Sequence, residues 1–423
     1  MLASLSTFPP PPASEGCKED DPHYPLGLTQ EEKQWSDLYP YAERRGYRLR
    51  SRYRPGWVGS WIKDGISTSE LLMRPTWKYE YEDAEPSTGR LTVIDAIRIS
   101  DGALVALKLI SMSAHINTPD SNEIEILQYL SSPALARNPR NHCIQMIDSF
   151  EVFTPAEMKQ LSTQGFSNAF IAVFPYARKW NDIPFRLVWE ALEFVRQILQ
   201  GLTFLHEHNI AHRDIRSENL MMDASSQCFS ATNPSDRIET PVRYFLIDLG
   251  SSTRFQKRRL VNFRHGWHKG IPEIYEMDAE GSRVPTKLYD PFKGDVFVLG
   301  MILEGFFGKS IPSLRSLFSF MQNVSPHHRP TASEALSLFH ECTKPLYASR
   351  MNLIMPVTDP STLTVEDTEL DPFTRWMVQI VAFFWEAGQY GGVLPDMVAR
   401  FKAINQLNHR SHIQVITGES ESI

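Results

Sequence analysis

Two short segments near the middle of the chain carry residue types that can do chemistry together. The first reads HRDIRSEN and covers residues 212–219, and the second reads IDLG and covers residues 247–250. A carboxylate such as that of Asp214 can orient a hydroxyl group and accept its proton. The Asn219 amide and the Asp248 carboxylate offer the hard oxygen ligands that Mg²⁺ prefers. The residue types and their order therefore favour transfer chemistry on a hydroxyl group beside a bound cation.

A long helix and two strands must position these segments. Apolar residues recur at i, i+3, i+4 and i+7, which predicts a helix from about 188 to 208, directly before the first segment. Strand-like apolar runs follow at 219–222 and 244–247, and the polar stretch 224–243 is predicted to be an insertion between them. The alternative is a chance Asp/Asn cluster on a loop. The placement of the segments, after a helix and between strands, argues against chance.

Two earlier runs predict a β-hairpin. β-Branched residues dominate 91–99, the turn Ser100-Asp101-Gly102 follows, and 103–110 is a second apolar run. Residues 123–130 then show helical spacing, so that strands and helix together predict a small α+β lobe. Further helical patterns lie later in the chain, at 294–307, 311–321, 331–342 and 371–386.

The two segments resemble the H-R-D-L-x-x-x-N and D-F-G patterns of the eukaryotic protein-kinase superfamily. The resemblance implies an α+β fold of two lobes, a small mainly-β N-lobe with helix C and a larger mainly-α C-lobe. It implies ATP and Mg²⁺ as cofactors, with Asp214 as the catalytic base and with Asn219 and Asp248 as metal ligands. Arg216, also counted with the catalytic residues, stands where serine/threonine kinases usually have a lysine.

The resemblance also extends to a nucleotide site. The VALK run that ends at Lys108 resembles the V-A-I-K strand, so that Lys108 is expected to pair with the α- and β-phosphates of ATP. Glu123 resembles the helix-C glutamate that pairs with this lysine, and Glu125 is the weaker candidate. FIAVFPYA at 170–177 resembles the strand and hinge beside adenine. The remaining nucleotide-binding residues that the resemblance implies are Val93, Ala106, Phe174 (at the gatekeeper position), Tyr176, Ala177 and Met221.

Three further motifs resemble structural landmarks of the C-lobe. IPE at 271–273 resembles A-P-E, and HRPT at 328–331 resembles the segment whose arginine closes an ion pair with that glutamate. DVFVLG at 295–300 resembles the helix that anchors the catalytic loop. Small-molecule kinases of the aminoglycoside-phosphotransferase type lack these landmarks. The resemblance therefore favours a protein kinase that acts on Ser/Thr hydroxyls over a small-molecule kinase.

The glycine-rich loop of the superfamily is missing. Counted back from Val93, its glycine positions fall on Pro86, Thr88 and Leu91, and a single glycine, Gly89, lies nearby. Because glycines let a backbone approach phosphates closely, we expect a looser cover over ATP or a longer loop. The alternative function is therefore a pseudokinase or scaffold that keeps the fold, with or without nucleotide binding, and transfers phosphate slowly or not at all.

The predicted activation segment, 248–273, is rich in cations. Its hydroxyl-bearing residues before Pro272 all lie at 251–253, and Gly266 stands where a family threonine would contact the catalytic Asp. Phosphorylation in mid-segment is thus excluded as a switch, and we expect the segment to be placed constitutively or ordered by an acidic partner. A solvated loop and the recognition of an acidic or phosphorylated partner, such as an acidic protein substrate, are the two interpretations of its charge. The cations are Arg254, Lys257, Arg258, Arg259, Arg264 and Lys269.

Composition shifts along the chain predict its domain organisation. The start of the chain contains a Pro run and a charged cluster, which are typical of disorder. The predicted parts are a disordered Pro-rich tail at 1–24, an N-terminal extension at 25–85 that packs on the kinase domain, a protein-kinase-like domain at 86–343 with lobes at about 86–177 and 178–343, and a C-terminal extension at 344–423 with a helix at about 371–386.

The aromatic and basic stretch 47–57 has two interpretations. Basic residues interleaved with aromatic ones can bind nucleic acid, or the stretch can pack its aromatic side chains on a neighbouring domain. Its Pro and Gly punctuation, and a net charge of −7 for the whole chain, favour packing. The overlapping segment Arg52–Trp61 resembles the kinase-like proteins of mushroom-forming fungi. The preceding helix, for which Thr29 is the expected N-cap, the Phe-Pro-Tyr hinge and the segment 241–250 share this resemblance.

The composition is typical of an intracellular protein, cytoplasmic or nuclear. The 423 residues are 42% hydrophobic and the pI is about 6.0, so that neither a nucleic-acid nor a membrane partner is expected. Four widely spaced cysteines lack CxxC spacing, which argues against a zinc site and a disulfide framework. The N-terminus does not resemble a secretory signal. The best candidate for a membrane span, 376–385, is too short.

Overall fold

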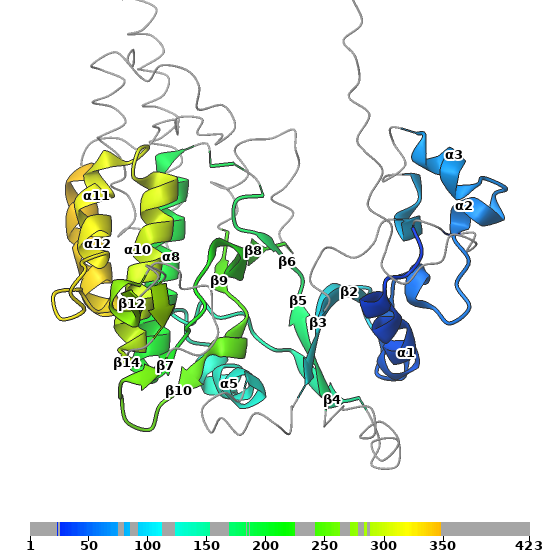
Figure 1. Cartoon of the computed structure of the whole chain (residues 1–423), viewed down its shortest axis with the longest axis horizontal. Helices are drawn as coiled ribbons and strands as arrows, with labels where there is room; N and C mark the ends of the chain where they lie inside the picture. Colours follow the sequence, from blue (N-terminus) through cyan, green and yellow to red (C-terminus); the bar gives the residue numbers. More distant parts are fainter. Residues whose placement is uncertain are drawn as a thin grey trace, which may run out of the picture. The chain divides into compact units, whose positions relative to one another are not determined.

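The computed structural model of the protein divides into two units, which are described in turn (Figure 1). The N-terminal unit comprises Met1–Asn117 and Gln145–Tyr176, and the C-terminal unit comprises Thr118–Ile144 and Ala177–Ile423. Within them the structure describes residues 23, 26–74, 80–84, 92–111, 123–152, 169–182, 184–185, 187–224, 242–262, 271–277, 283–285 and 288–347. The predicted helix at 371–386 lies outside these residues.

A five-stranded antiparallel sheet forms the N-terminal unit. The predicted hairpin is confirmed, because β2 and β3 pair with Val93 opposite Lys108 and Ile97 opposite Leu104. Gly102 in its turn has a φ of 72°, a conformation that glycine adopts without strain. The order of the strands is β1-β2-β3-β5-β4. Their bounds are β1 Tyr47–Leu49, β2 Val93–Arg98, β3 Leu104–Ser111, β4 Asp148–Glu151 and β5 Ala169–Pro175.

The N-terminal extension contributes both a helix and a strand to this unit. Helix α1, Gln30–Arg44, begins with the predicted N-cap, because Thr29 Oγ1 accepts the Glu32 N–H at 3.1 Å and the Glu32 carboxylate accepts the Thr29 N–H at 3.0 Å. Its buried apolar side chains pack on one face of the sheet in a shared core. Strand β1 pairs with β2, so that the sheet already starts at Tyr47.

The chain between β1 and β2 folds into short helices around a second core. Trp61 is fully buried there, and its indole N–H donates to Thr68 Oγ1 at 2.9 Å. Arg52 is buried as well and pairs with Glu32 at 3.0 Å. The burial of Arg52 and Tyr53 agrees with the packing interpretation of the stretch 47–57. The short helices are η1 Ser51–Tyr53, α2 Ser60–Lys63, α3 Thr68–Leu72 and η2 Glu82–Ala84.

Helices dominate the C-terminal unit, and the long one matches its prediction. Helix α8, Val188–Glu207, is almost wholly buried, which explains its strong apolar periodicity. Helix α10 begins three residues earlier than predicted, because the Asp290 side chain caps it at the N–H groups of Phe292 and Lys293. The single helix predicted at 311–321 is instead two consecutive helices, the 3₁₀ helix η7, which begins at Pro312, and α11. The other helices are α5 Glu123–Leu130, α6 Pro133–Ala136, α10 Pro291–Phe307, η7 Pro312–Leu314, α11 Arg315–Met321 and α12 Ala332–Tyr347.

Short strands of the C-terminal unit hold the loops that carry the sequence motifs. The predicted strands at 219–222 and 244–247 are confirmed within one residue, as β8 and β9 of a three-stranded sheet ordered β6-β8-β9. Three further pairs are β7 with β10, β11 with β14 and β12 with β13. The bounds are β6 Ala177–Lys179, β7 Ile210–Ala211, β8 Leu220–Asp223, β9 Tyr244–Leu246, β10 Thr253–Arg254, β11 Val261–Asn262, β12 Tyr275–Met277, β13 Arg283–Pro285 and β14 Leu288–Tyr289.

Among the helices that the structure describes, none is both long enough and apolar enough to cross a bilayer.

Candidate active site

Asp214 and Asn219 are joined directly in the loop between β7 and β8. The Asn219 side-chain amide donates to the Asp214 carbonyl at 2.8 Å and to Asp214 Oδ2 at 3.0 Å. Asp214 Oδ1 is buried and accepts no hydrogen bond from any group in the described part of the chain. One carboxylate oxygen is therefore fixed while the other remains able to accept a proton from a hydroxyl group.

Asp295 of helix α10 holds the start of this loop. Its carboxylate accepts the backbone N–H of His212 on Oδ2 and that of Arg213 on Oδ1, both at 2.8 Å. The His206 Nε2 lies 3.0 Å from the same Oδ2. Burial alone would raise the pKa of the Asp295 carboxyl, but the hydrogen bond with His206 and the nearby imidazoles outweigh it and lower the pKa. A buried carboxylate thus anchors the loop, as the motif at 295–300 predicted.

Asp248 adopts a left-handed backbone conformation directly after β9. Its φ is 63°, which is uncommon for a residue other than glycine and marks a turn held by its surroundings. The preceding residue fixes this turn to the loop of Asp214, because the Ile247 N–H donates to the Asn219 carbonyl at 3.0 Å and the Ile247 carbonyl lies 3.0 Å from His212 Nε2. The two chemistry-bearing segments are therefore hydrogen-bonded side by side.

Glu123 of helix α5 lies at the turn that follows Asp248. A methyl group placed on Gly250 would lie 3.3 Å from Asp248 Oδ1 and 3.3 Å from Glu123 Oε2. Only a glycine leaves this space open, which gives the glycine of the IDLG segment a packing reason. Asp248 and Glu123 therefore both border the space beside Gly250.

The C-terminal unit also holds the other predicted residues of its own segments. Arg216 lies in the same loop, where its Nε is 3.1 Å from Glu218 Oε2 at the surface. Met221 in β8 pairs with Lys179 of β6, the strand that Ala177 begins. The structure therefore brings the segments of Asp214, Asn219 and Asp248 together, with Glu123 at the turn after Asp248. It places Ala177 and Met221 on two paired strands of the same unit.

The N-terminal unit holds the remaining predicted nucleotide-binding residues. Ala106 and Lys108 alternate along β3 with residues of the shared core, so that they lie on the opposite face of the sheet. Val93 is paired with Lys108 across β2, and Phe174 is paired with Ala106 across β5. Phe174 is buried and Tyr176 is exposed at the end of the unit. These five positions therefore cluster on one sheet and the segment that leaves it.

Counting back from Val93 found no glycine loop because the neighbouring strand, β1, lies much further back in the chain. The neighbour of β2 is Tyr47–Leu49, and the whole segment from 50 to 92 intervenes between the two strands. Just after β1, the Arg50 Nε donates to both carboxylate oxygens of Asp95 at 2.9 and 2.8 Å. Sequence reasoning missed this pair. The alternation of Tyr47, Arg48 and Leu49, buried, exposed and buried, is the signal that could have revealed the strand.

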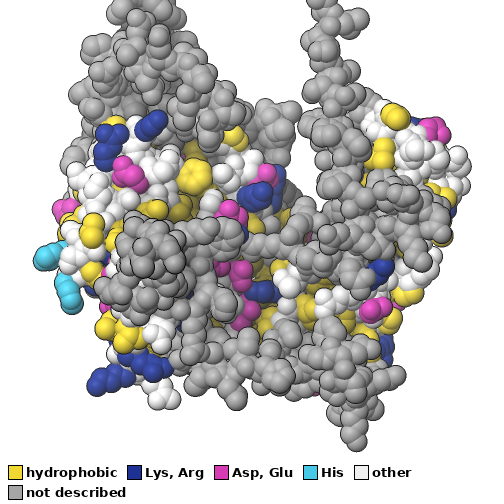
Figure 2. Space-filling model, viewed as in Figure 1, with side chains coloured by type: hydrophobic (Ala, Val, Ile, Leu, Met, Phe, Trp, Pro, Cys, Tyr) yellow, Lys and Arg dark blue, Asp and Glu magenta, His cyan; other side chains and the backbone are white. Residues whose placement is uncertain are grey.

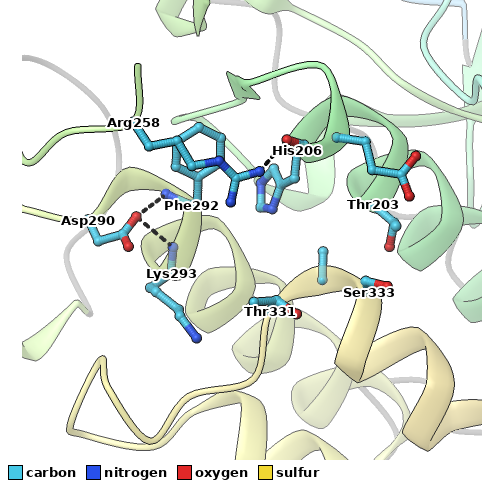
Figure 3. Close-up of a pocket in the computed structure, with 10 residues that line it drawn as sticks. Thr203, His206, Arg258, Asp290, Phe292, Lys293, Thr331 and Ser333 are labelled. Atoms are coloured by element: carbon cyan, nitrogen blue, oxygen red, sulfur yellow. Dashed lines mark hydrogen bonds between the residues drawn. The ribbon is translucent and has the colours of Figure 1, made fainter. Parts of the chain in front are cut away.

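The start of the activation segment is fixed along the C-terminal unit. The Arg258 guanidinium lies 4.3 Å above the Phe292 ring and donates to the His206 carbonyl and to Asn209 Oδ1. Figure 3 shows Arg258 drawn across Phe292 at the wall of a cavity of about 200 Å³, which Thr203 and Lys293 also line. The Arg254 guanidinium lies 3.5 Å above the Tyr129 ring of α5.

Basic side chains mark the surface of this segment. Arg254, Lys257, Arg258 and Arg259 are exposed. Figure 2 shows Lys and Arg side chains gathered at the lower edge of the C-terminal unit, in the region where Figure 1 labels β7 and β14. The predicted cations Arg264 and Lys269 lie outside the described residues.

The predicted ion pair of the C-lobe is confirmed. Arg329 donates to both oxygens of Glu273, at 2.8 and 2.7 Å, and its guanidinium is 4.6 Å from the centre of the Phe297 ring. Arg329 is only 1% exposed, so the pair is largely removed from water. It fixes the end of the activation segment to the loop before α12.

Comparisons with known proteins agree with this arrangement. The family profile described as "Protein kinase domain" matches residues 89–303. The chain is 30% identical over 154 residues to the serine/threonine-protein kinase pim-2 of Danio rerio (32% of this chain, 45% of the relative). It is 26% identical over 174 residues to the dual specificity protein kinase CLK4 of Mus musculus (39% of this chain, 34% of the relative). It is 34% identical over 134 residues to the meiosis-specific serine/threonine-protein kinase mek1 of Schizosaccharomyces pombe (31% of this chain, 26% of the relative). The chain spans less than half the length of each of these relatives.

Proposed function

Because the chain belongs to the protein kinase family, with the two-lobe α+β kinase fold, we propose that it transfers the γ-phosphate of ATP, with Mg²⁺, to Ser or Thr hydroxyls of protein substrates. The observation that carries the proposal is the joined pair of Asp214 and Asn219, which leaves one buried carboxylate oxygen of Asp214 able to accept a proton. This geometry supports a base that acts on a hydroxyl nucleophile.

Asp214 acts as the base in the proposed reaction. Its Oδ1 accepts the proton of the substrate hydroxyl as the hydroxyl oxygen attacks the γ-phosphorus and the bond to the β-γ bridging oxygen breaks. The Asn219 amide holds Oδ2, and Asp295 holds the backbone before the base, so that little reorganisation accompanies the transfer. Arg216 supplies a cation two residues after the base, where it offsets negative charge on the transferred group.

The residues present fit a bound Mg²⁺. Asn219 uses its amide nitrogen on Asp214, which turns its amide oxygen to the opposite side, and Asp248 offers a carboxylate beside that of Glu123. Asp248 and Asn219 would hold the ion, as the hard oxygen ligands that it prefers. When bound, Mg²⁺ neutralises charge between the phosphates and so makes the γ-phosphate open to attack.

The residues that resemble the family's nucleotide site are proposed to bind ATP. In the N-terminal unit, Lys108 would pair with its phosphates, and Val93 and Ala106 share a sheet face that would cover adenine. Phe174, Tyr176 and Ala177 would form the hinge side and Met221 the opposite adenine face.

Two features support a Ser/Thr substrate with acidic character. Relatives are named as serine/threonine or dual specificity kinases. The exposed cations between Arg254 and Arg259 would attract acidic side chains. Neither the family match nor these relatives favour the scaffold alternative.

Calorimetry and a peptide pool test the proposal. We expect Mg²⁺-dependent ATP binding that Lys108→Met and Asp248→Asn each weaken about tenfold, the loss typical of one hydrogen bond or contact to a charged group. Transfer to a mixed pool should mark Ser and Thr peptides over Tyr peptides. Absence of ATP binding at millimolar nucleotide would refute the proposal, and transfer to Tyr alone would refute its specificity.

A further inference from the structure

Arg213, the residue before the proposed base, is held by hydroxyl groups from two separate strands. Its Nη1 donates to Thr253 Oγ1 at 2.7 Å, and it also hydrogen-bonds the Tyr289 phenol. Its backbone has a φ of 64° and its N–H is bound to Asp295. The conformation of Arg213 therefore sets where the backbone delivers Asp214.

Thr253 stands at the first place where the activation segment is attached to the catalytic loop. It is fully buried and pairs with Ala211 across the β10–β7 ladder. The preceding Ser252 Oγ donates to the His212 carbonyl at 3.0 Å. Two successive hydroxyls of the segment thus contact two successive residues of the loop. Because Thr253 is buried, its hydroxyl is sequestered from a modifying enzyme.

Tyr289 stands at the second place of attachment. It lies in β14, opposite Val261 of the activation segment in β11. It is only 2% exposed, and burial raises the pKa of its phenol, so that the hydroxyl is neutral at physiological pH. Through Thr253 and Tyr289, Arg213 connects both ends of the described segment 253–262.

A phosphate group on a mid-segment residue would bind the arginine beside a kinase base and thereby order the segment. Here the described contacts of the Arg213 side chain include two hydroxyls that the chain itself supplies. We propose that Thr253 is a positioning residue, whose hydroxyl orients Arg213 and thereby Asp214, and that it does so with no phosphate on the activation segment. The proposal rests on the proposed function of Asp214 as the base.

The test compares two substitutions of Thr253 in the full chain. Thr253→Val keeps the shape and removes the hydroxyl, whereas Thr253→Ser keeps the hydroxyl. Ser251→Ala, which removes another hydroxyl of the same turn, is the matched control. For each protein, kcat and the KM for ATP are measured before and after phosphatase treatment, together with the thermal midpoint.

We expect Thr253→Val to lower kcat about tenfold or more with the KM for ATP within about twofold, because misplacement of the base affects the transition state more than nucleotide binding. Thr253→Ser and Ser251→Ala should stay within about threefold of the wild type. Phosphatase should change nothing. An unchanged kcat in a folded Thr253→Val protein, or loss of wild-type activity on dephosphorylation of the segment, overturns the proposal.

A second measurement separates this proposal from the proposed function. Amide hydrogen exchange at 211–216 and 252–256 reports the attachment without any turnover. Faster exchange in Thr253→Val, with Thr253→Ser and Ser251→Ala like the wild type, supports positioning by the hydroxyl. Equal exchange in all four proteins refutes it. If the four proteins show this exchange pattern but the wild type transfers no phosphate, the proposed function is refuted and the positioning contact remains established.

Discussion

The backbone N–H of Arg213 and the buried Oδ1 of Asp295 are 2.8 Å apart, so that a side chain of helix α10 fixes the residue directly before the proposed base. Asp295→Asn replaces one acceptor oxygen with an N–H₂ group, which cannot accept the N–H groups of both His212 and Arg213. We expect kcat to fall by about one to two orders of magnitude, as for a displaced catalytic group.

Asp290→Ala is the matched control for Asp295→Asn. Asp290 caps the same helix at the N–H groups of Phe292 and Lys293, and its removal should cost about 1 kcal/mol of stability. Its kcat should stay near that of the wild type. Equal losses of kcat in both variants would show that Asp295 acts only through the stability of α10.

The ion pair of Arg329 and Glu273 should be costly to break on one side. Glu273→Ala leaves Arg329, which is 1% exposed, without its bidentate partner, and we expect a loss of about 3–5 kcal/mol in the free energy of unfolding. Denaturant unfolding measures it. The half-exposed pair of Arg140 and Glu207 is the control, and Glu207→Ala should leave the midpoint almost unchanged. Similar effects of the two substitutions would contradict this view of the buried pair.

His142 should make the fold sensitive to acid. Burial lowers the pKa of its imidazole from 6.5 to about 4 and outweighs the hydrogen bonds with the Tyr244 carbonyl and Gln200, which raise it. The unfolded chain therefore takes up a proton before the folded one does. Its contribution is therefore complete above pH 6.5 and is lost as the pH falls toward 4, by up to about 3 kcal/mol.

Denaturant unfolding between pH 4 and 7 checks this prediction. In His142→Gln, the free energy of unfolding should fall less steeply over this range than in the wild type. The exposed His328, changed to Gln, serves as the control for loss of any one imidazole. Parallel pH profiles of His142→Gln and the wild type would exclude His142 as the source.

The stacking of Arg254 on Tyr129 should support the placement of helix α5, which also carries Glu123. Tyr129→Leu removes the aromatic face and Tyr129→Phe keeps it. We expect about 0.5–1 kcal/mol of destabilisation in the first variant and much less in the second. Thermal unfolding distinguishes them. The stacking would have no measurable effect if the two variants unfolded at the same temperature.

Local patterns predicted the parts of the site that depend on neighbouring residues. The helix at 188–207 and the hairpin of β2 and β3 follow from periodicity and from the turn at Gly102, because their hydrogen bonds join residues close in the chain. The HRDIRSEN and IDLG segments could be recognised from the sequence because the functional groups of each segment lie within a few residues of one another.

Contacts between distant residues had no such pattern. Strand β1 has three residues and its partner β2 begins only at Val93, so the alternation of Tyr47, Arg48 and Leu49 is too short to identify the strand without its partner. Arg213 and Thr253 are 40 residues apart, and nothing in their spacing indicates a hydrogen bond between them. Such pairs are fixed by the tertiary fold, which brings together segments that sequence patterns describe only separately.

The most direct test of the account is the transfer of γ-phosphate from ATP with Mg²⁺ to a Ser/Thr peptide pool by the full chain, with Asp214→Asn measured beside it. Asn keeps the size of the side chain and removes the carboxylate that accepts the proton. We expect the wild type to transfer phosphate about a hundredfold or more faster than the variant does, the usual contribution of a general base. Equal rates in the two proteins, or a wild type that binds ATP and transfers nothing, would contradict it.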